Sequence, residues 1–433
     1  MYTSEKRMSG FLIRVNIIIL VLSNFVNFSN YLLQLVLGRY LTPEDFGIYN
    51  SVVSLGVILA SLGQVLPNVA TKFIVKYSSN QDQTIALVKG LNKVVLIYGG
   101  LISVLFVALS GIMSSYLNLS SSTPVIIFVV SLYTFYWLSC YIGILNGLSK
   151  YVLVNRQMVA HAILRLVLTL VCVAVLGLSY NSVLAIPVIC NLVVFWWMAR
   201  VVKKNIFQSG SKDGSFTFEK EDLKEIGKYF VPVTLCWVVI NFMTNIDIVL
   251  VKHFCTAEEA GLYSVAALIG RVAFFLPQML LTVLFPEIAK RVGSGTGSFK
   301  VLGTIMALTL LTSGSMVGAV YFFPDMIVTM LFGEQFKGAS DYLVVITLGM
   351  ALFALLNIMV TVFLARADFK FLWSSYLGAG VTLGIIYTWL HNSPYEIALG
   401  ILAGSIILCI VNGYWLLHSM RSRPKSASIG SLD

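Results

Sequence analysis

Long apolar stretches, separated by short polar connections, run along almost the whole chain. An apolar stretch of 18 or more residues is long enough to cross a bilayer as a helix. The pattern predicts twelve such spans, and the connections leave no room for a second soluble domain. The predicted spans are 12–36, 47–74, 91–115, 122–146, 151–177, 180–201, 226–253, 260–289, 300–323, 340–365, 370–390 and 395–418.

The first apolar stretch is predicted to be a spanning helix and not a cleavable signal peptide. Its apolar core is interrupted by Arg14 and by several asparagines, and no small-residue cleavage site follows it. We therefore expect it to stay in the protein as the first transmembrane helix.

Composition agrees with a polytopic membrane protein. Of the 433 residues, 58% are hydrophobic and only 11% are charged, and the mean hydropathy is +0.88. Soluble globular proteins contain about 25% charged residues. The sequence therefore predicts an all-α membrane protein.

The basic residues predict the orientation of the spans. Alternate connections carry 24 of the 29 lysines and arginines, the opposite connections carry 3, and 2 arginines lie inside spans. The positive-inside rule then places both termini in the cytoplasm. The net charge of +10 is thus mostly a topology signal, and with no nucleic-acid-binding motif we expect no nucleic-acid partner.

The two halves of the chain are related by an internal duplication. Residues 27–50 align without gaps to residues 241–264, an offset of 214, and the identities include Thr42 with Thr256 and Tyr49 with Tyr263. Six spans per half make the repeats parallel, as in transporters that bind cargo between two halves. The predicted domains are an N-lobe (1–204), a cytoplasmic linker (205–224), a C-lobe (225–420) and a cytoplasmic tail (421–433).

Two arginines stand alone inside apolar spans, Arg165 in the fifth and Arg271 in the eighth. A charge at the centre of a bilayer is costly, so it usually faces a protein-lined cavity and has a partner. The favoured interpretation is contact with an anionic cargo, because the guanidinium fork matches phosphate. The alternative is a buried ion pair with Asp247 or Glu287.

Polar residues recur at helical spacing in helices 1, 2, 5, 7 and 8, which predicts a polar cleft between the halves. In helix 2 the polar residues from Ser54 to Lys72 share one side only if the segment is a single continuous helix. Each residue taken alone could instead hold helices together by hydrogen bonds. The candidate cargo-binding residues from these stripes are Asn27, Gln64, Asn68, His161, Asn241 and Gln278.

Two acids are candidates for ion coupling or charge pairing. Asp247 lies well inside the seventh span and either neutralises an arginine, the favoured interpretation, or carries a coupling H⁺ or Na⁺. Glu287 follows Pro286 near the cytoplasmic end of its span and is predicted to lie at a gate or an interface. No metal-ligand spacing occurs, and no cofactor is expected.

The segment LGRYLTPEDFGIYNSVVSLGVILASLGQVLPNVATKFIVKYSS resembles the N-terminal signature of polysaccharide flippases of the Wzx type, in the multidrug/oligosaccharidyl-lipid/polysaccharide exporter superfamily. In the second half, NIDIVLVKHFCTAEEAGLYSVAALIGRVAFFLP is similar to helices 7 and 8 of that family. The resemblance implies a V-shaped, MATE-like pair of six-helix lobes around a cationic cleft. It also implies movement of undecaprenyl-diphosphate-linked sugars across the bacterial inner membrane.

The sequence thus predicts a lipid-linked oligosaccharide flippase that serves O-antigen or a similar surface polysaccharide. Its expected partners are the lipid-linked oligosaccharide and membrane lipids, with a polysaccharide polymerase and a chain-length regulator as further candidates. An ion-coupled multidrug exporter is the alternative, although such a protein needs acids in its cleft. A glycan polymerase or ligase is disfavoured because no carboxylate pair or nucleophile–base arrangement occurs, so we expect no enzyme activity.

Overall fold

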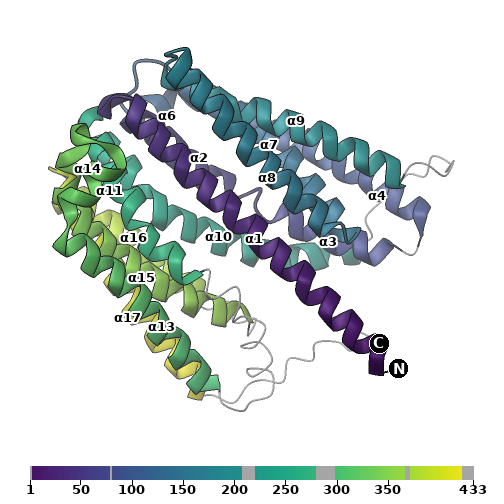
Figure 1. Cartoon of the computed structure of the whole chain (residues 1–433). Helices are drawn as coiled ribbons and strands as arrows, with labels where there is room; N and C mark the ends of the chain where they lie inside the picture. Colours follow the sequence, from purple (N-terminus) through teal and green to yellow (C-terminus); the bar gives the residue numbers. More distant parts are fainter. Residues whose placement is uncertain (1, 79, 207–219, 279–297, 366–370, 422–433) are drawn as a thin grey trace. The chain divides into compact units, whose positions relative to one another are not determined.

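The computed structural model describes residues 2–78, 80–206, 220–278, 298–365 and 371–421. Within these ranges every element is helical (Figure 1). Ten helices there are long and apolar enough to cross a membrane. The prediction of an all-α polytopic membrane protein is confirmed, and the two other predicted spans correspond to a pair of shorter helices, α2 and α3, and to α16.

The α-helices lie close to the predicted spans. Their bounds are α1 Tyr2–Tyr40, α2 Pro43–Ala60, α3 Leu66–Tyr77, α4 Gln81–Val94, α5 Gly100–Ala108, α6 Ser110–Tyr116, α7 Thr123–Gly147, α8 Tyr151–Leu170, α9 Tyr180–Ile206, α10 Lys220–Phe254, α11 Ala257–Gly270, α13 Ser298–Phe322, α14 Pro324–Phe332, α15 Ser340–Ala365, α16 Phe371–Trp389 and α17 Pro394–Arg421.

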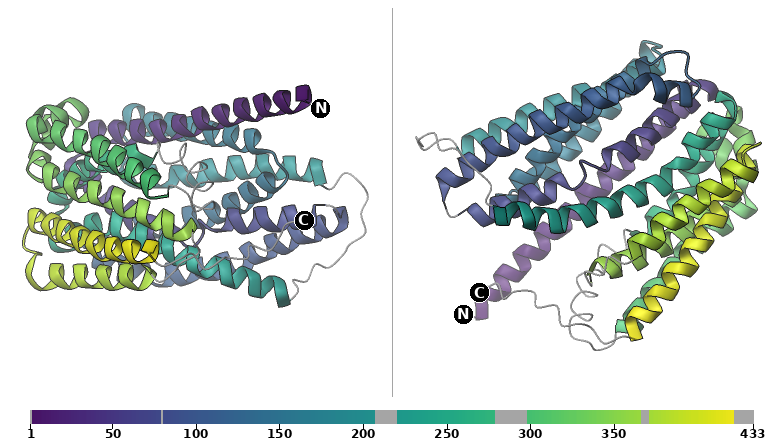
Figure 2. Two further views of the ribbon diagram at one scale, coloured as in Figure 1. Left: turned by 90° about the horizontal axis from the view of Figure 1, so that it is seen from below. Right: turned by 180° about the vertical axis from the view of Figure 1, so that it is seen from behind.

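The chain divides into two compact units, Met1–Val238 and Val239–Asp433, and the division falls within α10. In the first unit α8 packs along α1, and α7 packs against both α3 and α9 (Figure 1). In the second unit α15 packs against α11, α13 and α17, and α16 packs against α17 (Figure 2). Each unit therefore has its own helical core.

The prediction of one continuous helix over 47–74 is wrong. The structure has α2 and α3 instead, joined by a turn between Ala60 and Leu66. Backbone bonds of the i to i−3 type fill the turn, such as Gly63 N–H to Ala60 O at 2.9 Å. Pro67 in the first turn of α3 has no N–H to donate to Gly63. The polar stripe predicted from Ser54 to Lys72 is therefore split between two helices.

The predicted duplication is visible in the local structure. Helix α1 ends at Tyr40 and α10 ends at Phe254, while α2 begins at Pro43 and α11 at Ala257, so both pairs keep the offset of 214. Side-chain bonds also repeat. Asn50 Nδ2 donates to Phe46 O at 2.9 Å, and Ser264 Oγ donates to Ala260 O at 2.6 Å.

Both repeats begin their second helix with a threonine cap. The Asp45 N–H donates to Thr42 Oγ1 and the Glu259 N–H donates to Thr256 Oγ1, each at 3.2 Å. Only the second repeat completes a capping box, because the Thr256 N–H also donates to Glu259 Oε2 at 2.9 Å.

We expect Thr256→Ala to lower the free energy of unfolding by about 1 kcal/mol, because both contacts of the Thr256 hydroxyl with Glu259 are lost. Thermal unfolding of the purified protein in detergent measures this effect. The control is Thr388→Ala, because the exposed Thr388 hydroxyl donates to carbonyl oxygens of the preceding turn of α16, those of Gly384 and Ile385, and caps no helix. Equal melting temperatures of the two variants would contradict the capping role.

Two G-x-x-x-G pairs bring helices into close contact. Gly143 and Gly147 of α7 face α3, and Gly400 and Gly404 of α17 face α16. A Cβ at Gly143 would lie 2.5 Å from the carbonyl oxygen of Pro67. Small residues at this spacing let membrane helices approach closely.

Candidate functional site

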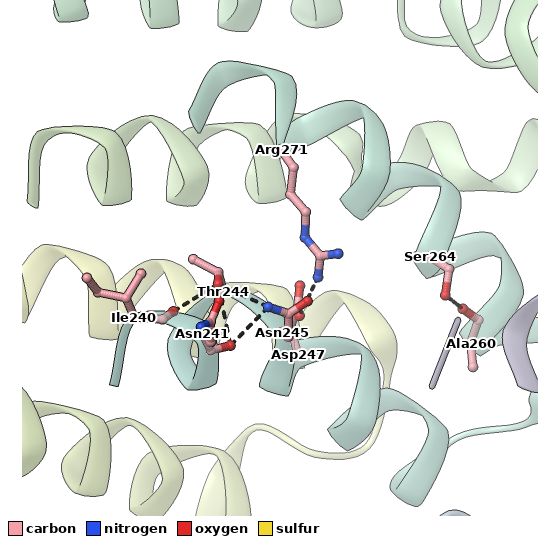
Figure 3. Close-up of polar contacts among 8 residues, drawn as sticks. All are labelled: Ile240, Asn241, Thr244, Asn245, Asp247, Ala260, Ser264 and Arg271. Atoms are coloured by element: carbon pink, nitrogen blue, oxygen red, sulfur yellow. Dashed lines mark hydrogen bonds and ion pairs between the residues drawn. The ribbon is translucent and has the colours of Figure 1, made fainter. Parts of the chain in front are cut away.

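Arg271 forms an ion pair with Asp247 in the second unit (Figure 3). Arg271 follows α11 directly, and its Nη2 lies 3.3 Å from Oδ1 of Asp247 on α10. The Asp247 side chain is 0% exposed and that of Arg271 is 13% exposed. The structure thus places Arg271 against Asp247, one of the two acids named as its partner in the charge-pairing interpretation.

This ion pair leaves hydrogen-bonding capacity unused. Asp247 Oδ2 and Arg271 Nε are buried, and neither atom has a hydrogen-bond partner among the described residues. The hydroxyl of Tyr263, a residue with 0% exposure on α11, interacts with the Asp247 carboxylate. A bidentate arginine–carboxylate pair would engage more of these atoms. The guanidinium therefore keeps a donor for another acceptor.

The first unit has the same local fold without these charges. At the offset of 214, Asp247 corresponds to Leu33 and Arg271 corresponds to Val57, whereas Tyr263 corresponds to the buried Tyr49. Leu33 is 2% exposed, so an apolar side chain fills the position of the aspartate. The helix pair forms without the ion pair in one repeat, which points to a role other than folding in the other.

Arg165 lies on the inner side of α8. Ala160, Ile163 and Val167 mark the exposed face of this helix, and at 100° per residue Arg165 lies on the opposite side. Its charge acts on His161, one turn before it, and on Cys190 of α9. Among the residues whose side chains the structure describes, Arg165 has no hydrogen-bond or ion-pair partner.

His161 takes part in a hydrogen-bonded cluster that joins three helices. Its Nε2 lies 3.0 Å from Oδ1 of Asn191 on α9, a residue that is 4% exposed. Asn191 Nδ2 in turn donates to Ser131 O at 3.3 Å and to Thr134 Oγ1 at 3.0 Å, both on α7. One of the two ring nitrogens of His161, Nε2, is therefore used in contacts that hold helices together.

The other predicted residues lie in varied surroundings. Asn27 on α1 and Asn68 on α3 are exposed, while Gln64, in the turn before α3, is half-buried. In the second unit Asn241 and Gln278 are half-buried, and the backbone oxygen of Asn241 accepts from Asn245 Nδ2 at 2.9 Å (Figure 3). Glu287 lies outside the described residues.

Asn191 was missed by the sequence reasoning. It is one amide within the apolar sequence of α9, and its partners lie 30 to 60 residues away in the chain. A lone polar residue inside a predicted span was the available signal. For metals, the described residues contain no group of three or more His, Cys, Asp or Glu side chains that could hold an ion.

Comparison with known proteins identifies related families and folds. A family model described as "Polysaccharide biosynthesis protein" matches residues 13–292. No curated protein sequence matches the chain.

Three solved structures share its fold. An inward-facing multidrug resistance MATE family transporter of the MOP superfamily has 14% identity and a TM-score of 0.77, covering 92% of this chain and 95% of its own. The lipid II flippase MurJ, in an inward closed conformation, has 16% identity and a TM-score of 0.69, with coverages of 94% and 88%. A MOP superfamily transporter from Pyrococcus furiosus has 14% identity and a TM-score of 0.60, with coverages of 94% and 95%.

Proposed function

Since the chain belongs to the polysaccharide biosynthesis protein family, we propose that it flips undecaprenyl-diphosphate-linked oligosaccharides across the bacterial inner membrane. The family and the MOP-superfamily fold support a multi-pass membrane transporter or flippase. The proposal goes beyond this support when it names the lipid-linked cargo, its use for O-antigen or a similar polysaccharide, and the inner membrane.

The choice of cargo rests on the surroundings of Arg165. It is a permanent cation on the inner side of an apolar helix, and it has no counter-ion among the described side chains. An unpaired charge in such surroundings is costly unless a ligand or water meets it. A diphosphate offers both the negative charge and the paired oxygens that a guanidinium fork binds.

Arg271 is the second candidate residue for binding an anionic cargo in this proposal. Its pair with Asp247 has one long contact of 3.3 Å, and its Nε has no hydrogen-bond partner among the described residues. Alternating access, with the lipid tail kept in the bilayer, would carry the headgroup across. A polysaccharide polymerase would take up the flipped unit on the far side.

We expect Arg165→Ala to abolish export of the surface glycan in cells that depend on this protein, because the diphosphate loses its unpaired cation. Arg165→Lys should retain only a small part of the export, since an ammonium ion cannot form the two parallel bonds of a guanidinium. Surface glycan is measured by gel staining, and membrane levels of each variant are matched by immunoblot.

Arg200→Ala is the matched control, because Arg200 is exposed on α9 and stacks on Trp196, with 3.3 Å from Cζ to the ring centroid. Export should continue in this control. Normal export by Arg165→Ala at a matched protein level would remove the diphosphate role. Altered drug susceptibility with unchanged glycan export would favour a multidrug exporter instead.

A further inference from the structure

The hydrogen bonds of Asn191 fix the orientation of its own amide group. Ser131 O is a carbonyl oxygen and can only accept, so the atom of Asn191 that contacts it at 3.3 Å must be the NH₂ group. The Thr134 hydroxyl donates its proton to Ser131 O at 2.8 Å, and it therefore accepts from the same NH₂ group. The amide oxygen of Asn191 is left to face His161.

This orientation determines which nitrogen of His161 carries a proton. The amide oxygen of Asn191 accepts from Nε2, so Nε2 carries the hydrogen. In the neutral ring Nδ1 then bears a lone pair and is a hydrogen-bond acceptor. Like charges at positions i and i+4 destabilise a helix, and Arg165 therefore favours the neutral ring.

His161 and Arg165 together offer an acceptor beside a cation. Neither Nδ1 of His161 nor the Arg165 guanidinium has a hydrogen-bond partner among the side chains that the structure describes. The two residues are one helical turn apart on the inner side of α8, a rise of about 6 Å. A complementary ligand has an anionic oxygen for Arg165 and a hydroxyl or amide N–H group for His161.

We propose that His161 Nδ1 accepts a hydrogen bond from the sugar that is attached directly to the diphosphate, while Arg165 binds the phosphate. Asn191 is a positioning residue, because it holds the ring in this tautomer and does not touch the cargo. This inference rests on the proposed function. It adds that the protein discriminates a glycosylated lipid diphosphate from the bare lipid diphosphate through one acceptor on α8.

Two substitutions of His161 test the acceptor at Nδ1 independently of the hydrogen bond between Nε2 and Asn191. The amide of glutamine reaches about as far as Nε2, so His161→Gln keeps a donor for Asn191 and loses the acceptor at Nδ1. The shorter asparagine ends near Nδ1, so His161→Asn keeps an acceptor there and loses the bond to Asn191. Both variants remain polar and uncharged, which limits the change in stability.

The test measures binding of two probes to the purified full-length protein in nanodiscs. One probe is a polyprenyl diphosphate, and the other is the same lipid diphosphate with one N-acetylhexosamine, which has both hydroxyl and amide donors. Wild type should prefer the glycosylated probe by about tenfold, a typical effect of one hydrogen bond. His161→Gln should lose that preference and bind the bare diphosphate as before, and His161→Asn should retain part of the preference. Arg165→Ala should bind both probes more weakly.

Selective ¹⁵N labelling of histidine gives a readout that does not depend on transport. The chain has only 4 histidines, and the spectrum of His161→Gln assigns the signals of His161. We expect a protonated Nε2 and an unprotonated Nδ1 in wild type, and a mixture of tautomers in Asn191→Leu. An unchanged preference in His161→Gln, or a protonated Nδ1 in wild type, would overturn the inference. If wild type binds neither probe, the proposed function itself fails.

Discussion

We expect Arg271→Val to lower the free energy of unfolding by about 3–5 kcal/mol, because it leaves the Asp247 carboxylate buried without its counter-ion. The reciprocal change, Asp247→Leu, should also be destabilising. The double variant Asp247→Leu/Arg271→Val should recover most of the lost stability, since an apolar pair often replaces a buried ion pair at no net cost. Thermal unfolding in detergent compares the four proteins.

The design of the double variant comes from the protein's own duplication. Leu33 and Val57 occupy these two positions in the first repeat, where the same threonine cap and the same buried tyrosine are present. The replacements are therefore already tolerated by this helix pair. Arg200→Val serves as the control for loss of an exposed arginine and should leave the melting temperature almost unchanged.

The same double variant decides whether the ion pair serves transport. A stable double variant without glycan export would assign Arg271 and Asp247 to function, because the fold has been preserved. Full export by that variant would remove Arg271 from the cargo-binding residues and leave the proposal on Arg165. A double variant as unstable as Arg271→Val would contradict the structural equivalence of the two repeats.

The sequence predicted the features that depend on local pattern. The offset of 214 follows from residues that are close together in the chain, and the ends of α1 and α10 and the threonine caps at Thr42 and Thr256 keep this offset in the structure. Asp247 and Arg271 are 24 residues apart on consecutive helices, and charge pairing was one of the two predicted outcomes. Such features need no knowledge of which distant helices become neighbours.

Features that depend on contacts between distant helices could not be predicted. Asn191 was missed because its partners come from α7 and α8, and nothing in the α9 sequence specifies them. The break between α2 and α3 was missed because apolar composition continues through it. One of the three basic residues counted on the opposite connections is Lys252, and it is 3% exposed in the last turn of α10.

The contact between α7 and α3 depends on the absence of a side chain at Gly143. A Cβ there would lie 2.6 Å from Ala70 Cβ and 2.8 Å from Pro67 Cα, and backbone atoms cannot rotate away. The Thr71 hydroxyl also lies 3.0 Å from Gly143 O, and it bridges to Pro67 O at 2.7 Å. Any larger residue at position 143 must therefore move one helix away from the other.

We expect Gly143→Leu to lower the free energy of unfolding by about 3 kcal/mol or more, because the displaced helices lose packing as well as the Thr71 contact. Gly143→Ala should have a smaller effect in the same direction. Gly100→Leu is the matched control, since Gly100 has a helical φ of −63° and nothing within 4 Å of its ideal Cβ.

The amount of monomeric protein after detergent extraction, followed by its melting temperature, measures these effects. Leucine has a higher helix propensity than glycine, so the control should melt at or slightly above the temperature of wild type. Leucine brings the same increase in helix propensity at position 143, but the clash with the Pro67 backbone outweighs it there. Equal melting temperatures of Gly143→Leu and Gly100→Leu would mean that α3 and α7 are not held at the observed distance. The close glycine contact would then not be a determinant of the fold.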